Sequence, residues 1–198
     1  MLVTTGAADQ GRRSHGRRFD GVTTCVALLR GIAPMNPSMS NTNLRAVCES
    51  VGLGNVSTVI SSGNVVFETD TDDIAGLEST LEEAWPEKLG FESTTIIRTR
   101  RELETLVELG PFGTLEHGPE TYLLVTFAKH PLPRELEAKP PPESGYRVLP
   151  FAEREIFTVT DMTAGRAPDV MAWVERAFGK EVTSRTWLTV GRILKKMG

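Results

Sequence analysis

The sequence has few of the residues that build a disulfide framework, a metal site or a membrane segment. It contains two cysteines, Cys25 and Cys48, and three histidines among 198 residues. No CxxC, HExxH, Walker or GxGxxG motif is present. No apolar run approaches the ~18 residues that a membrane helix needs, and the N-terminus has no apolar signal core. We therefore expect a cytoplasmic protein that has no cofactor, binds no metal and makes no contact with a membrane.

The net charge of the chain limits the kinds of molecule that it is expected to bind. The net charge is −4, and the body of the chain is more acidic still, because residues 1–20 hold four arginines. That balance excludes a protein that coats DNA through a broad positive face, but it leaves room for a small anion site. We predict that residues 1–20 form a disordered basic extension. The alternative is a basic arm that touches nucleic acid; the four arginines are Arg12, Arg13, Arg17 and Arg18.

The hydrophobic pattern of the first half predicts a strand, a helix, a strand pair, a helix, a strand and a final helix. Continuous apolar residues indicate a buried strand, and apolar residues at i, i+3, i+4 and i+7 indicate an amphipathic helix. Thr99 and Glu102 match the capping box that opens a helix, and Pro86 is expected to end or kink the helix before it. The predicted strands cover 22–29, 56–61, 64–69 and 94–98, and the helical stripes cover 44–51, 74–85 and 103–107.

The second half repeats this order of elements, which suggests a duplication. Each unit resembles the ferredoxin-like plan, an antiparallel sheet with helices on one face. We predict an α+β fold of two tandem ferredoxin-like βαββαβ units, each with an extra C-terminal helix, over 21–110 and 120–198. The predicted strands cover 122–127, 146–149, 155–160 and 182–186, with a helical turn over 133–136 and helices over 170–177 and 187–197.

One hairpin stands out within the first unit. Two β-branched runs meet at Gly63 and Asn64, a pair typical of a tight turn. Ser61, Ser62 and Asn64 lie at that turn. They could satisfy turn backbone groups, with Gly63 supplying a positive φ, or they could hold a ligand rigidly.

Four short segments, in this order, carry a family resemblance: 28–32 (LLRGI), 62–67 (SGNVVF), 97–99 (IRT) and 183–190 (TSRTWLTV). Together they resemble the DUF1697 family of bacterial proteins of unknown function. The resemblance implies an α+β fold with tandem ferredoxin-like halves, and it supplies no established substrate or catalytic residue. Many members follow the first segment with a Gly-Gly loop, whereas residues 33–38 contain two prolines here. Those prolines remove two amide donors from any backbone phosphate cradle.

The candidate site residues lie in or beside these segments. Arg30 ends a strand, where it could hold a phosphate or pair with an acidic residue. Arg185 and Thr186 precede the last helix. The free amides at the start of that helix attract anions, and Thr186 can serve as its N-cap. Farther along that helix, Arg192, Lys195 and Lys196 are interpreted as cations placed favourably near a helix C-terminus.

The leading functional hypothesis is a protein that binds a phosphate-bearing ligand, a nucleotide or short RNA, without catalysis. The predicted binding residues are Arg30, Ser62, Asn64, Arg185 and Thr186. One alternative is an enzyme acting on a small anionic substrate, for which no acid–base pair can be named. The other is a protein–protein interaction module. The sequence leaves catalytic residues and oligomeric state open.

Overall fold

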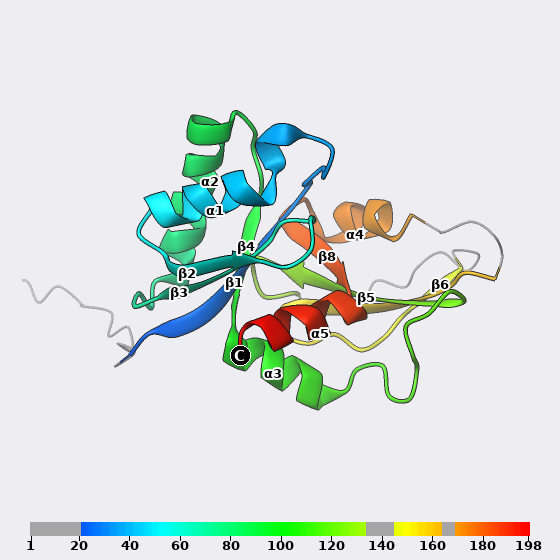
Figure 1. The fold of residues 1–198 in the computed structure, drawn as a ribbon. Helices are drawn as coiled ribbons and strands as arrows, with labels where there is room; N and C mark the ends of the chain where they lie inside the picture. The colour runs from blue at the N-terminus through cyan, green and yellow to red at the C-terminus, as the bar shows by residue number, and fades with distance from the viewer. Residues whose placement is uncertain (1–20, 134–144, 164–168) are drawn as a thin grey trace, which may run out of the picture.

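The chain folds into two four-stranded antiparallel sheets (Figure 1). The computed structural model describes residues 21–133, 145–163 and 169–198. The first sheet has the order β2-β3-β1-β4 and the second the order β6-β7-β5-β8. The strands are β1 (Thr23–Leu29), β2 (Gly54–Thr58), β3 (Asn64–Thr69), β4 (Thr95–Thr99), β5 (Thr121–Ala128), β6 (Tyr146–Val148), β7 (Glu155–Asp161) and β8 (Val182–Thr186).

Five α-helices and one short 3₁₀ turn occur within the described ranges. Helices α1 and α2 pack on one face of the first sheet, and α4 packs on one face of the second (Figure 1). Helices α3 and α5 each follow the last strand of a sheet and contact one another. The elements are η1 (Pro37–Met39), α1 (Asn41–Ser50), α2 (Ile74–Leu89), α3 (Arg100–Leu109), α4 (Val170–Phe178) and α5 (Trp187–Lys196).

The two sheets share a hydrophobic core. Its buried residues come from both sheets and from α3 and α5, and Phe112 packs edge-on against Phe157 and Trp187 within it. Two further cores lie on the outer faces, under α1 and α2 and under α4. The mixed α+β class is therefore confirmed, and the division into units 21–110 and 120–198 stays a prediction.

Helix boundaries follow from local side chains. The capping box predicted at Thr99 forms in full, since Glu102 N donates to Thr99 Oγ1 and Thr99 N donates to Glu102 Oε2 at 2.7 Å. Pro86, expected to end or kink α2, does not end the helix, which continues to Leu89 and closes at Gly90, whose φ is +73°, and the kink stays a prediction. The buried contacts of the helical turn before Pro86 stabilise the helix by more than the loss of one backbone hydrogen bond, which proline cannot donate, destabilises it.

The predicted hairpin forms, since β2 pairs antiparallel with β3 and Gly63 has a φ of +73°, but the tight turn predicted at Gly63 and Asn64 is wrong. Strand β2 ends at Thr58, a loop covers 59–63, and Asn64 is the first residue of β3. The loop is shaped by its neighbours: Leu29 N donates to Gly63 O at 2.8 Å, and a Cβ on Gly63 would lie 2.5 Å from Ile32 Cγ1. Only glycine fits that approach.

Two sets of predictions fall outside the described residues. These are the extension over 1–20 and residues 134–136 of the predicted helical turn. In the part of the chain that the structure covers, no helix is both long and apolar enough to span a membrane.

Candidate functional site

Arg185 extends from β8 into the first half of the chain, where it meets Asn64. Its Nε donates to Asn64 Oδ1, and Nη2 donates to two carbonyl oxygens at the ends of the central strands, Leu29 O at 2.8 Å and Gly63 O at 3.1 Å. Nη1 bonds two acceptors on its own strand, Thr183 Oγ1 and Ser184 O, both at 2.8 Å. These acceptors use all five N–H groups of a guanidinium, so Arg185 acts as a clamp between the halves.

Asn64 connects this clamp to the loop over 59–63. Its side chain is 1% exposed, and its Nδ2 donates to Val59 O and to Ser62 Oγ, both at 3.0 Å. Because Ser62 Oγ accepts that hydrogen bond, its own hydroxyl proton is left to donate elsewhere. Ser62 is half-buried and is therefore the member of the group that can reach a ligand.

The structure brings Ser62, Asn64 and Arg185 together and gives Thr186 a capping role beside them. Thr186 Oγ1 accepts from Thr189 N at 3.1 Å and lies 2.8 Å from Thr189 Oγ1, so it caps α5 as its sequence position suggests. Arg30 has a separate partner. Its Nη2 lies 2.5 Å from Glu175 Oε1 on α4, while its buried Nε has no hydrogen-bond partner.

Sequence reasoning missed a second buried arginine, Arg98 on β4. Its Nε donates to Glu155 Oε1 at 2.8 Å, and Nη2 donates to Ala128 O at 2.7 Å and to Arg154 O at 3.4 Å. Nη1 bonds the preceding carbonyl, Ile97 O, at 3.0 Å. As in Arg185, Nε bonds a side-chain oxygen of the opposite half and Nη2 bonds two of its backbone carbonyls, with the direction between the halves reversed. The signal was available, because both arginines precede a threonine that ends a strand and caps a helix.

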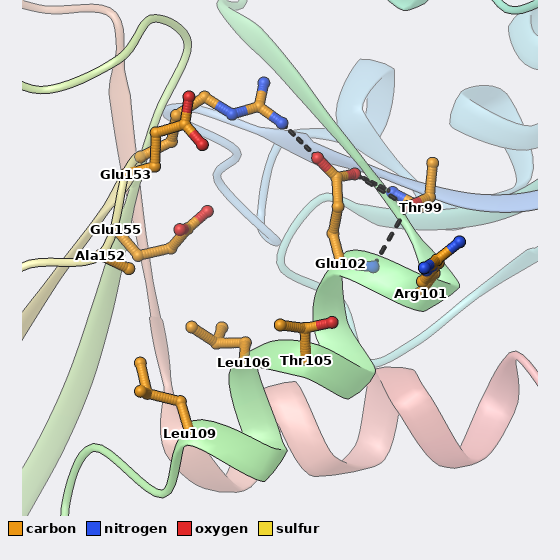
Figure 2. Close-up of a pocket in the computed structure, with 10 residues that line it drawn as sticks. Thr99, Arg101, Glu102, Thr105, Leu106, Leu109, Ala152, Glu153 and Glu155 are labelled. Atoms are coloured by element: carbon orange, nitrogen blue, oxygen red, sulfur yellow. Dashed lines mark hydrogen bonds and ion pairs between the residues drawn. The ribbon is translucent and has the colours of Figure 1, made fainter. Parts of the chain in front are cut away.

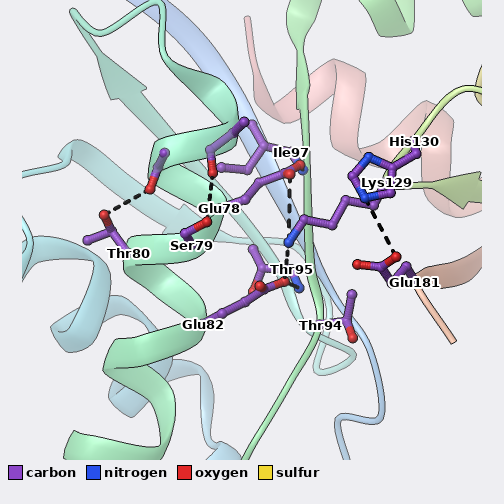
Figure 3. A network of polar contacts seen from close by, with 12 residues as sticks. Glu78, Ser79, Thr80, Glu82, Thr94, Thr95, Ile97, Lys129, His130 and Glu181 are labelled. Atoms are coloured by element: carbon purple, nitrogen blue, oxygen red, sulfur yellow. Dashed lines mark hydrogen bonds and ion pairs between the residues drawn. The ribbon is translucent and has the colours of Figure 1, made fainter.

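A second reciprocal pair joins the outer helices to the opposite half. Just as Arg30 follows β1 and bonds α4, Lys129 follows β5 and bonds α2 (Figure 3). Lys129 Nζ lies 2.7 Å from Glu82 Oε1 and 3.9 Å from Glu78 Oε2. Arg98 with Arg185, and Arg30 with Lys129, therefore form two reciprocal pairs of cations that join the halves.

The carboxylates of α2 also cover the outer edge of β4. Glu78 Oε1 accepts from Ile97 N at 2.8 Å, and Glu82 Oε1 accepts from Thr95 N at 2.9 Å (Figure 3). Burial raises the pKa of Glu78, opposed by the amide of Ile97 and then by Lys129. Both contacts of this carboxyl are structural, since one oxygen accepts from Ile97 N and the other lies 3.9 Å from Lys129 Nζ.

The two buried arginines differ in charge compensation. Arg98 has the carboxylate of Glu155, whereas Arg185 has the neutral amide of Asn64 at the corresponding place. Burial lowers the pKa of Arg185 to about 10, still well above neutral pH. Among the described residues no carboxylate pairs with Arg185, so its positive charge is left without a partner.

A groove of about 380 Å³ lies beside Arg98, between α3 and the residues that precede β7 (Figure 2). Thr99, Glu102 and Thr105 line one side, and Glu153 and Glu155 line the other. The ion pair between Glu102 and Arg154 crosses it. None of the predicted binding residues lines this groove. Elsewhere in the described ranges, no cluster of three or more His, Cys, Asp or Glu side chains is arranged for a metal ion.

The fold and these contacts define an α+β protein whose two sheets are joined by exchanged cations. The family described as "Protein of unknown function (DUF1697)" matches residues 22–157, and the chain belongs to that family. Among solved structures, it is similar to the conserved bacterial protein SP0830 from Streptococcus pneumoniae, with 19% sequence identity and a TM-score of 0.65. That match covers 89% of this chain and 99% of the pneumococcal one, and it shows a shared fold. No curated protein matches this sequence.

Proposed function

We propose that the protein binds a phosphate-bearing ligand, a nucleotide or short RNA, without catalysis, where the loop over 59–63 meets the start of α5. The observation that carries this proposal is the unpartnered charge of Arg185. A buried cation with neutral neighbours creates a local positive potential, because little solvent screens it. An anion near Ser62 supplies the charge that Glu155 supplies to Arg98.

The predicted residues take different roles in this site. Ser62 donates its free hydroxyl proton to the ligand, and Asn64 fixes that hydroxyl by donating to its oxygen. Arg185 acts through its field, since its donors are all occupied. Thr186 holds the N-terminus of α5, whose first amides add partial positive charge. Arg30, at the end of β1, contributes less to this potential, because Glu175 offsets its charge.

We also infer that both units follow the ferredoxin-like plan and arose by duplication. Two observations support this. The strand orders correspond one to one, and Arg98 and Arg185 bond equivalent strand ends in the opposite unit. Ligand sites commonly form at such junctions between units.

Calorimetry with inorganic phosphate, uridine monophosphate and a short RNA at low salt tests the proposed function. We expect binding by the wild type, about tenfold weaker binding by Ser62→Ala through loss of one charge-assisted hydrogen bond, and none by Asn64→Asp, whose carboxylate takes the place of the anion. Glu153→Ala, in the groove beside Arg98, is the control and should bind normally. Absence of binding to all three ligands would refute the proposal, as would unchanged binding by both site variants.

A further inference from the structure

We propose that the ligand is a single-stranded polynucleotide whose backbone continues from Ser62 along α5 and the edge strand β2. This inference rests on the proposed function and adds the substrate class. Its basis is a row of cations on α5 and a polar hollow at the far end of that row.

The cations lie on the solvent side of α5. Two of them, Arg192 and Lys195, lie four and seven positions after Leu188, so the three side chains share one face of the helix. This stripe starts with Leu188, beside Arg185. All three are exposed, as is Lys196. Across the residues described, no acidic side chain pairs with Arg192, Lys195 or Lys196. A helix C-terminus accounts for one or two cations in its last turn, but Arg192 lies a full turn earlier.

The same helix packs along β3 and ends beside β2. Buried residues of α5 share a core with Val59 and Val66, and Lys196 lines a hollow of about 450 Å³ together with Asn55 and Ser57 of β2. The hydroxyl of Ser57 has no hydrogen-bond partner among the described residues. Asn55 Nδ2 donates to Glu68 Oε2 at 2.5 Å, so the one carboxylate lining this hollow is engaged by an amide.

The dimensions fit a chain of phosphates. Helix α5 has ten residues and spans about 15 Å, while the five residues of β2 span about 17 Å. Helix α5 and strand β2 are therefore of similar length. Ser62 lies near one end of the proposed binding track, and Lys196 lies at the other end. A single mononucleotide occupies one end of this track. A flexible single strand can follow it, and its successive phosphates meet Arg192, Lys195 and Lys196.

The charge of the whole molecule favours a single strand over a duplex. The net charge of −4 disfavours contact with a polyanion over a broad face, whereas Arg192, Lys195 and Lys196 form a narrow basic track. A rigid duplex approaches over a wide face and would meet the acidic body as well. The aromatic residues along the track are packed inward, since Phe67 is fully buried and the half-buried Trp187 packs against Phe112. We therefore expect little base stacking and little sequence preference.

The test measures binding of fluorescently labelled octauridylate and of uridine monophosphate at several salt concentrations. We expect the octamer to bind at least tenfold more tightly than the monophosphate. The slope of log K against log salt should be about −2, because each phosphate that is neutralised on a single strand contributes about −0.7. The triple variant Arg192→Gln, Lys195→Gln, Lys196→Gln should lose most of that slope while its affinity for uridine monophosphate is unchanged. Arg101→Gln on α3, at the position equivalent to Leu188, is the matched control.

The outcomes separate the two proposals. Equal affinity for octamer and monophosphate would overturn the polynucleotide inference and leave the phosphate site standing, as would an unchanged salt slope in the triple variant. Tighter binding of an eight-base-pair duplex than of the single strand would also overturn it. Binding of neither ligand by the wild type would refute both proposals.

Discussion

Arg98 and Arg185 occupy equivalent positions in the two halves of the chain, and each guanidinium bonds the strand ends of the opposite half. The residue that meets Nε differs, because Glu155 is charged and Asn64 is neutral. The same geometry is thus used once as an ion pair and once as an uncompensated cation. The first two predictions come from replacing the neutral partner of Arg185 with a carboxylate and the carboxylate partner of Arg98 with a neutral amide.

Asn64→Asp should add about 1 kcal/mol of stability at pH 7 through a charge-assisted hydrogen bond to the buried Arg185, and this gain is offset by the loss of the two hydrogen bonds that Asn64 Nδ2 donates to Val59 O and Ser62 Oγ. The introduced carboxyl should have a folded-state pKa below the ordinary value of about 4. The added stability is therefore present above that pH and is lost as the pH falls. Urea unfolding of both proteins between pH 3 and pH 7 measures it. A variant whose stability falls no more steeply than that of the wild type between pH 7 and pH 3 would contradict this account of the site.

Glu155→Gln should destabilise the protein by about 2 kcal/mol, because it leaves a second buried guanidinium without a counter-charge. The loss should stay below that of Arg98→Ala, since the variant keeps the carbonyl acceptors of Arg98. Denaturant unfolding at fixed pH compares the two. Equal stability of Glu155→Gln and wild type would show that the carboxylate is dispensable.

Glu78 should make stability depend on pH in the unusual direction for a carboxyl. Burial raises its folded-state pKa above 4.5, so the folded state binds the proton more tightly and this contribution to stability falls as the pH rises above 4.5. Glu78→Gln should remove that fall and be no less stable than wild type at pH 7. Glu78→Ala should lose about 2 kcal/mol, because Ile97 N is left without an acceptor. Thermal unfolding of both variants from pH 4 to pH 7 checks the pair; equal stability of the two would contradict the assigned contact.

Ile60→Gly should stabilise the protein by about 1 kcal/mol, because a left-handed backbone costs a β-branched residue that much and glycine very little. Ile60 has a φ of +50° and is exposed, so the substitution removes little packing. Urea unfolding measures the gain, and Val22→Gly, an exposed apolar residue outside the strands, is the control. A loss of stability in Ile60→Gly would mean that its side chain makes a contact that outweighs the strain.

Much of the fold was predictable because hydrophobic period is a local signal. The strands and helices of both halves, and the capping box at Thr99, follow from residues a few positions apart. The turn at Gly63 was not predictable, since contacts with Leu29 and Ile32 shape that loop. The meeting of Ser62, Asn64 and Arg185 could be named as a set, but the binding role given to Arg185 ignored that backbone carbonyls far along the chain use its donors.

Arg98 was overlooked for a related reason. A buried arginine is recognised by its acceptors, and three of the four acceptors of Arg98 lie 30 to 57 positions farther along the chain. The Arg-Thr pair that ends both β4 and β8 was the one sequence signal. It points to equivalent buried arginines only when the two halves are compared.

The exchanged arginines also set an order of events during synthesis. When β4 leaves the ribosome, Arg98 lacks its counter-charge and its acceptors in the second half, because Ala128, Arg154 and Glu155 have yet to be translated. Arg185 emerges last and finds its acceptors already in place. The nascent first half therefore carries a cation without its counter-charge through much of translation. The ion pair of Arg98 and its hydrogen bonds to the second half can form only after those residues have been translated.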